Sequence, residues 1–120
     1  MGTRGYVLQQ EQVTGSGNAT PTLADSGTTY VNNGAYNIAL PAAPTDTLTE
    51  PEYSYIFIVG NASYLKVTAN GTDVIRYKDT TTAAGGYVRS QTLGNLIKIR
   101  CVVGGEWLIE NLEGTWTYDS

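Results

Sequence analysis

Four acidic side chains, Asp73, Asp79, Glu106 and Glu110, are the groups in this chain that could form a catalytic pair. A glycoside hydrolase needs two carboxyl groups about 5–10 Å apart, one acting as an acid and the other as a base or nucleophile. The surrounding sequence gives these residues simpler roles, in turns and in an ion pair of Glu110 with Arg100. We therefore expect that the protein is not an enzyme, and a paired-carboxylate hydrolase is the alternative.

The chain lacks the residues that other common kinds of catalysis require. The chain has no histidine and a single cysteine, Cys101, so Ser-His-Asp and Cys-His catalysis and Cys/His zinc sites are excluded. The oxygen-rich segments 25–27 and 70–73 do not have the spacing of a calcium loop. We expect no metal and no cofactor, and we expect Cys101, which lies in an apolar run, to be a small core residue.

The chain has 120 residues and a net charge of −4, from 7 basic and 11 acidic residues. Its length predicts one domain, and an acidic chain without clustered Lys and Arg predicts no nucleic-acid partner. No segment approaches the roughly 18 apolar residues of a membrane span, and the N-terminus lacks a secretory signal. We therefore expect synthesis in a cytoplasm and no membrane partner. The charged fraction of 15% is low, which suggests that further surface is buried in an assembly.

Short runs rich in Tyr, Val, Ile and Thr recur about every ten residues from residue 30 onward, which is typical of sandwiches and barrels. No segment has the sustained apolar period of a helix. We predict an all-β fold, a small antiparallel β-sandwich or barrel, with an extended N-terminal arm. The segment 40–51 contains three prolines and is expected to be a loop or crossover. The predicted strands are 28–32, 36–40, 53–59, 63–69, 73–78, 87–93, 96–103, 107–112 and 115–118.

Two turn signals predict hairpins. Asn70-Gly71 is a strong signal, and it would pair 64–69 with 72–77. In the other hairpin, a regular two-residue turn at Gly104-Gly105 would place Ile99 opposite Glu110, an acid on the apolar face. We therefore predict a three-residue loop, 104–106, with a glycine in the left-handed region. This loop pairs Cys101 with Ile109 and Arg100 with Glu110.

Aromatic residues mark a candidate interface. Tyr53, Tyr55 and Phe57 lie on one face of the strand 53–59, and isoleucines lie on the other, so both faces should be covered. Such a strand is either central in the sheet or at a subunit interface. Trp116, beside Gly114, is the better candidate for an exposed or intersubunit aromatic, whereas Trp107 falls on the predicted core face. The nine tyrosines also leave open a role in stacking on sugar rings.

The first 29 residues differ in composition from the β-domain expected at 30–120. Residues 9–29 are polar and rich in Gly, Ser, Asn and Thr, which predicts an arm or tether that is ordered only if something holds it. The apolar segment before it contains Tyr6, Val7 and Leu8. An apolar strand on a polar tether can add to the sheet of a neighbouring protein through main-chain hydrogen bonds.

Five short motifs follow one another along the chain: ADSGTTY at 24–30, IALPAA at 38–43, GTDVIR at 71–76, AAGGY at 83–87 and GTWT at 114–117. Through these motifs, the chain from Leu23 to Tyr118 resembles a module that recurs in structural proteins of tailed phages and prophages. The resemblance implies a virion surface component, commonly a homotrimer, such as a head decoration (cement) protein, a head fibre or a tail-fibre segment. It carries over no catalytic residue.

Among these possibilities, the short chain beginning at a methionine favours a decoration protein that binds the major capsid protein on the outer surface of the phage head. Its binding to the assembled shell would stabilise the shell by mass action. The alternative is a fibre module that recognises host surface glycan. The residues expected to anchor the protein to the capsid are Tyr6, Val7 and Leu8. Those expected to form trimer contacts are Tyr53, Tyr55, Phe57 and Trp116.

Overall fold

The computed structural model describes residues 11–44 and 53–119, and the predicted all-β fold is confirmed. The helical structure in these two ranges is one 3-10 turn, η2 (Leu23–Asp25). The strands are β1 (Gln12–Ala19), β2 (Thr29–Ala39), β3 (Ser54–Ile58), β4 (Leu65–Thr68), β5 (Val74–Tyr77), β6 (Thr80–Thr81), β7 (Tyr87–Ser90), β8 (Leu96–Val103), β9 (Glu106–Glu113) and β10 (Thr117–Tyr118).

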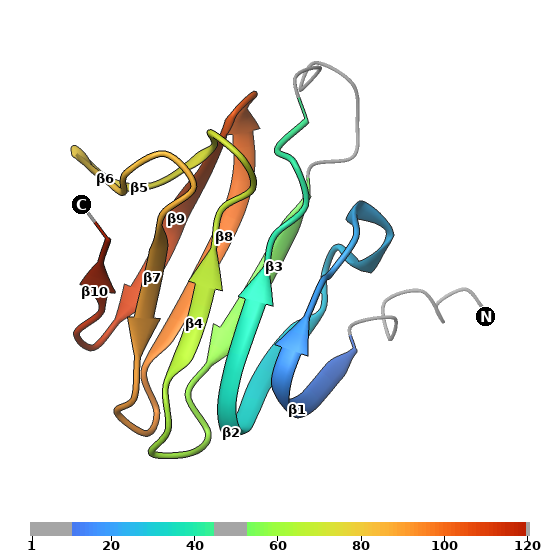
Figure 1. The fold of residues 1–120 in the computed structure, drawn as a ribbon, viewed down its shortest axis with the longest axis vertical. Coiled ribbons are helices and arrows are strands. Elements are labelled where there is room, and N and C mark those ends of the chain that lie inside the picture. The colour runs from blue at the N-terminus through green and yellow to red at the C-terminus, as the bar shows by residue number, and fades with distance from the viewer. Residues whose placement is uncertain (1–10, 45–52, 120) are drawn as a thin grey trace.

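The strands form one sheet that folds over on itself and is nearly closed into a barrel. Its order is β10-β7-β4-β2-β3-β8-β9-β5-β6, and β1 pairs with β2 off this path. Figure 1 shows β2, β4 and β7 in front of β3, β8 and β9. The two ends of the sheet meet where the Ala83 N–H donates to the Asp119 carbonyl, at 2.7 Å. The molecule therefore has a front layer (β4, β7, β10) and a back layer (β3, β8, β9, β5, β6).

Strand β2 connects the two layers because its two halves have different partners on the same edge. Residues 29–31 pair with β3, and residues 36–39 pair with β4. Asn32, which is 1% exposed, stabilises the bend between the halves. Its Nδ2 donates to the Gly34 and Ser63 carbonyls at 2.9 Å, and its Oδ1 accepts from the Gly60 N–H at 2.8 Å. This one side chain thus satisfies backbone groups that the departing strand leaves without ladder partners.

The core lies between the layers and is built from alternate residues of the strands. In β3, Tyr55, Phe57 and the following Val59 are buried, as the alternation predicts, while the isoleucines between them are half-buried. Trp107 is fully buried on the predicted core face and lies 5.6 Å from the Tyr55 ring. Cys101 is also buried, at 2% exposure, which confirms its expected role.

The predicted hairpin 64–77 is wrong in its pairing. The turn exists, with the Asp73 N–H donating to the Asn70 carbonyl and Gly71 at φ 53°. Its two flanking strands, however, enter different layers: β4 pairs with β2 and β7, whereas β5 pairs with β9 and β6. An Asn-Gly turn specifies a local reversal of the chain, but the burial of both strands depends on partners that are distant in sequence.

The predicted three-residue loop of the β8–β9 hairpin is also wrong. Val103 pairs with Glu106 across the two-residue Gly104-Gly105 turn, and the register shifts between Cys101 and Val103. This bulge lets Ile99 pair with Ile109, so the two-residue turn places no acid on the apolar face. The glycine in the left-handed region is confirmed, because Gly105 has φ 81°.

The sheet also differs from the expectation in strand direction and in extent. It is mixed rather than antiparallel throughout, since β1, β3 and β4 all run parallel to β2. The proline-containing connection between β2 and β3 is long enough for such a crossover. Residues 12–19, which the sequence assigns to the arm, form β1 along β2. The described sheet therefore begins N-terminal to residue 30.

Candidate functional site

The side chains expected at a trimer interface are mostly core residues of the single chain. Tyr55 and Phe57 are fully buried, and Trp116 is 5% exposed with its Nε1 donating to the Glu113 carbonyl at 3.2 Å. Tyr53 is half-buried and packs against the same core. Tyr55, Phe57 and Trp116 are thus accounted for within the protomer, and contacts with another copy would have to use other side chains.

The expected anchor residues Tyr6, Val7 and Leu8 lie outside the described residues. The strand that follows them along the chain is β1, an eight-residue strand whose side chains are mostly exposed. It pairs with β2 on one edge, and no described strand pairs with its other edge. A sheet edge of this kind offers unpaired N–H and C=O groups to a strand from another protein.

The four acidic residues considered for catalysis have separate roles. Asp73 Oδ2 accepts the Ala43 N–H at 2.8 Å, and Glu106 forms an ion pair with Arg76. Asp79 is exposed in the β5–β6 turn. Across residues 11–44 and 53–119, no group of three or more acidic or cysteine side chains could hold a metal ion. In the same ranges, no helix has the length and apolar character needed to cross a membrane.

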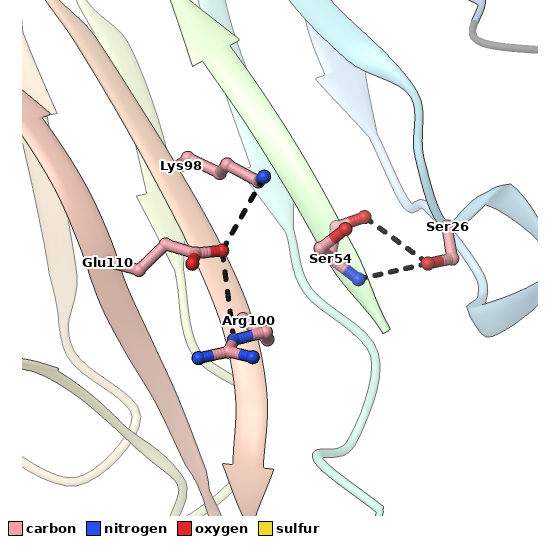
Figure 2. Close-up of polar contacts among 5 residues, drawn as sticks. All are labelled: Ser26, Ser54, Lys98, Arg100 and Glu110. Carbon is pink, nitrogen blue, oxygen red and sulfur yellow. Dashed lines mark hydrogen bonds and ion pairs between the residues drawn. The ribbon is translucent and has the colours of Figure 1, made fainter. Parts of the chain in front are cut away.

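On the back layer, Glu110 neutralises two cations. Its Oε1 lies 3.6 Å from Lys98 Nζ and 3.7 Å from Arg100 Nε, and Figure 2 shows the carboxylate between the two basic side chains. The predicted Arg100–Glu110 ion pair therefore exists, although Arg100 pairs in register with Leu108. Figure 2 also shows the Ser26 hydroxyl at the start of β3, where it accepts the Ser54 N–H at 2.9 Å.

The outer face of the front layer carries a line of polar residues that runs across five strands. The register places each of them directly beside the next, from β1 through β2, β4 and β7 to β10. The buried Ile38, Val67 and Val88 alternate with them along the strands, so they point away from the core. We call this line the polar row. It consists of Asn18, Asn37, Lys66, Arg89 and Thr117.

The two cations of the polar row contact tyrosine rings. The Arg89 guanidinium lies 4.5 Å from the centre of the Tyr64 ring and 5.3 Å from that of Tyr87, and Lys66 Nζ lies 4.8 Å from that of Tyr87. Lys66 and Arg89 are directly opposite each other in the β4–β7 ladder, an arrangement in which like charges repel. The nearest acid in register is Asp119, which follows β10 and donates its N–H to the Tyr87 carbonyl.

A shallow groove of about 480 Å³ adjoins the polar row at its β1 end. Its walls come from the last residues of β1 and β2 and from the outward side chains of β4. Within it, Asn37 Nδ2 donates to Asn18 Oδ1 at 3.3 Å. The lining residues are Asn18, Ala19, Thr20, Asn37, Ile38, Ala39, Lys66 and Thr68.

Several buried groups, among them Tyr30, Tyr55 and Cys101, have raised pKa values because burial disfavours their charged forms. Burial, with a smaller contribution from Asp25, raises the pKa of Tyr30 from 10.0 to about 12. Burial raises the pKa of Tyr55 further, and its hydroxyl donates to the Thr22 carbonyl at 2.6 Å. Burial also raises the pKa of the Cys101 thiol, followed by the effect of Asp73. A thiol in this state is a poor nucleophile.

Comparison with known proteins adds no family assignment. Neither the models of known protein families nor the curated protein sequences give a match to this chain.

Sequence reasoning missed the polar row because its members come from five strands that are neighbours in the sheet but are not all consecutive in the sequence. Each of these residues is ordinary by itself, and only the register brings them side by side. The alternation in 64–69 did carry part of the signal, since Lys66 lies between the apolar Leu65 and Val67. The residues that hold β2 in its bend, above all Asn32, gave no signal of this kind.

Proposed function

We propose that this protein is a non-catalytic structural component of a phage virion, and that it decorates the outer surface of the head by binding the major capsid protein. The resemblance of residues 23–118 to phage structural modules suggests the virion. The low charged fraction and the many tyrosines suit a protein that is partly covered by its neighbours. A homotrimer on the head surface is the assembly we propose.

The observation that best supports attachment of the protein to the capsid is the unpaired edge of β1. The Thr29 N–H donates to the Glu11 carbonyl, so alternate residues of β1, Gln12 and Thr14 among them, turn their N–H and C=O groups away from β2. A strand of a capsid subunit can bond to these groups. The anchor residues Tyr6, Val7 and Leu8 precede β1 by a few positions in the sequence, which supports the proposal that both segments bind the same partner.

The first test is co-sedimentation with emptied heads of the phage that encodes the chain. We expect the protein to elute as a trimer in size-exclusion chromatography with light scattering, to sediment with the heads and to raise their thermal stability. Deletion of residues 1–10 should leave the fold intact and reduce head binding at least tenfold. A longer deletion is unsuitable, because residues 12–19 belong to the sheet. A monomer that does not sediment with heads would contradict the proposal.

A further inference from the structure

We infer that the polar row is a binding site for a carboxylate-bearing polysaccharide. The site lies on the outer face of the front layer and includes Tyr64 and Tyr87. This inference goes beyond head attachment, which uses the edge of β1, and it gives the glycan alternative a location. It does not depend on the proposed attachment to heads.

The charge of the row is the first argument. Lys66 and Arg89 are two cations directly opposite each other on this face, yet the chain as a whole is acidic. Within the described ranges, neither forms an ion pair with a carboxylate, and the side chain of Arg89, whose Nε is buried, donates no hydrogen bond. On the back layer, by contrast, Lys98 and Arg100 share Glu110. An anion bound between Lys66 and Arg89 would relieve their repulsion in the same way.

The neutral members of the row are the second argument. Asn18, Asn37 and Thr117 continue the line of hydrogen-bonding groups on both sides of the cations. Strands are spaced about 4.8 Å apart, so five of them span about 19 Å. A line of amides and hydroxyls with charge at its centre suits a sugar chain that carries many hydroxyl groups and only occasional carboxylates.

The aromatic residues are the third argument. Tyr64 is 41% exposed and supplies an apolar surface with a polar tip, on which the C–H groups of a sugar ring can lie. The Arg89 guanidinium lies 4.5 Å from the centre of the Tyr64 ring and 5.3 Å from that of Tyr87, and these contacts orient it without a competing carboxylate. A nucleic acid fits less well, because its dense phosphates would face a protein of net charge −4.

Binding to soluble polysaccharides tests the inference. The probes are fragments of hyaluronan, unsulfated chondroitin and gellan, in which only some of the sugars carry a carboxylate, with neutral dextran and duplex DNA as comparisons, measured by calorimetry at low salt. We expect at least one carboxylated probe to bind, dextran and DNA to bind at least tenfold more weakly, and the affinity to fall as salt is raised. Lys66→Gln and Arg89→Gln should each weaken binding at least tenfold, and Asn37→Ala severalfold.

Lys78→Gln is the matched control, because Lys78 Nζ lies 5.3 Å from the centre of the Tyr77 ring in the β5–β6 turn, away from the row. This variant should bind as the wild type does. Thermal unfolding will confirm that all variants fold, and we expect no loss of stability beyond a few degrees in the two charge variants. Absence of binding to all three carboxylated probes, equal binding of dextran or DNA, or equal loss in Lys78→Gln would overturn the inference.

Discussion

At the scale of single residues, the hydroxyl of Tyr55 links the N-terminal segment to the core. It donates to the Thr22 carbonyl next to η2 at 2.6 Å. Tyr55→Phe removes this bond and little else, so it should lower the free energy of unfolding by about 1 kcal/mol. Urea unfolding measures the effect, and Tyr64→Phe, which removes an exposed hydroxyl, should change stability by a few tenths at most. Equal stability of the wild type and Tyr55→Phe would contradict this role.

Tyr30 and Tyr55 also predict how stability depends on pH. Their pKa values are raised by burial in the folded state, so the folded protein keeps protons that the unfolded chain releases above pH 10. The contribution of these two tyrosines to stability should therefore be constant below about pH 10 and should fall as the pH rises toward about 12. Urea midpoints across this range check the prediction. The fall should be smaller in the Tyr30→Phe/Tyr55→Phe variant, and a midpoint that stays constant to pH 12 would refute it.

At the scale of elements, the bend of β2 decides the architecture, and Asn32 holds it. Asn32→Ala would leave the Gly34 and Ser63 carbonyls and the Gly60 N–H without their partner, at a cost of about 2–4 kcal/mol. Thermal and urea unfolding should show this loss. The neighbouring exposed residue gives the control, since Asn33→Ala should be close to neutral. If the two variants unfold alike, the side chain of Asn32 does not hold the bend.

The strands could be predicted from sequence more fully than their pairing. Alternation placed Tyr55, Phe57 and Trp107 on buried faces, and it placed most strands within a few residues of their observed bounds. The partners could not be predicted, because they depend on register between distant segments. The bulge after Cys101 and the separation of β4 from β5 are stabilised by long-range burial, which overrides the local turn signals. The polar row was missed for the same reason.

The prediction of an interface at Tyr55, Phe57 and Trp116 shows a related limit. An apolar pattern says that a side chain is covered, but it does not say whether the cover comes from the same chain. Here other parts of the same chain cover these three residues. The N-terminal segment shows that a polar pattern does not exclude a strand. Residues 12–19 are polar and were predicted to be a tether, yet they form β1 through main-chain hydrogen bonds with β2.

At the scale of the whole molecule, the two ends of the sheet, β6 and β10, lie next to each other. The long exposed edge of the described structure is therefore that of β1. The edges at β6 and β10 are short, and a hydrogen bond between Ala83 and Asp119 joins them. Strand β1 has eight residues and no comparable cover within residues 11–44 and 53–119. A long unpaired edge can pair with another strand, which is consistent with the proposed attachment to a capsid subunit.

Head binding by two variants at Thr14 tests this account most directly. Thr14→Pro removes an N–H that points away from β2, whereas Thr14→Ala removes the side chain and keeps the N–H. If a capsid strand pairs with β1, Thr14→Ala should sediment with emptied heads as the wild type does, and Thr14→Pro should bind at least tenfold more weakly while remaining folded. Equal binding of the two variants would contradict attachment through the edge of β1.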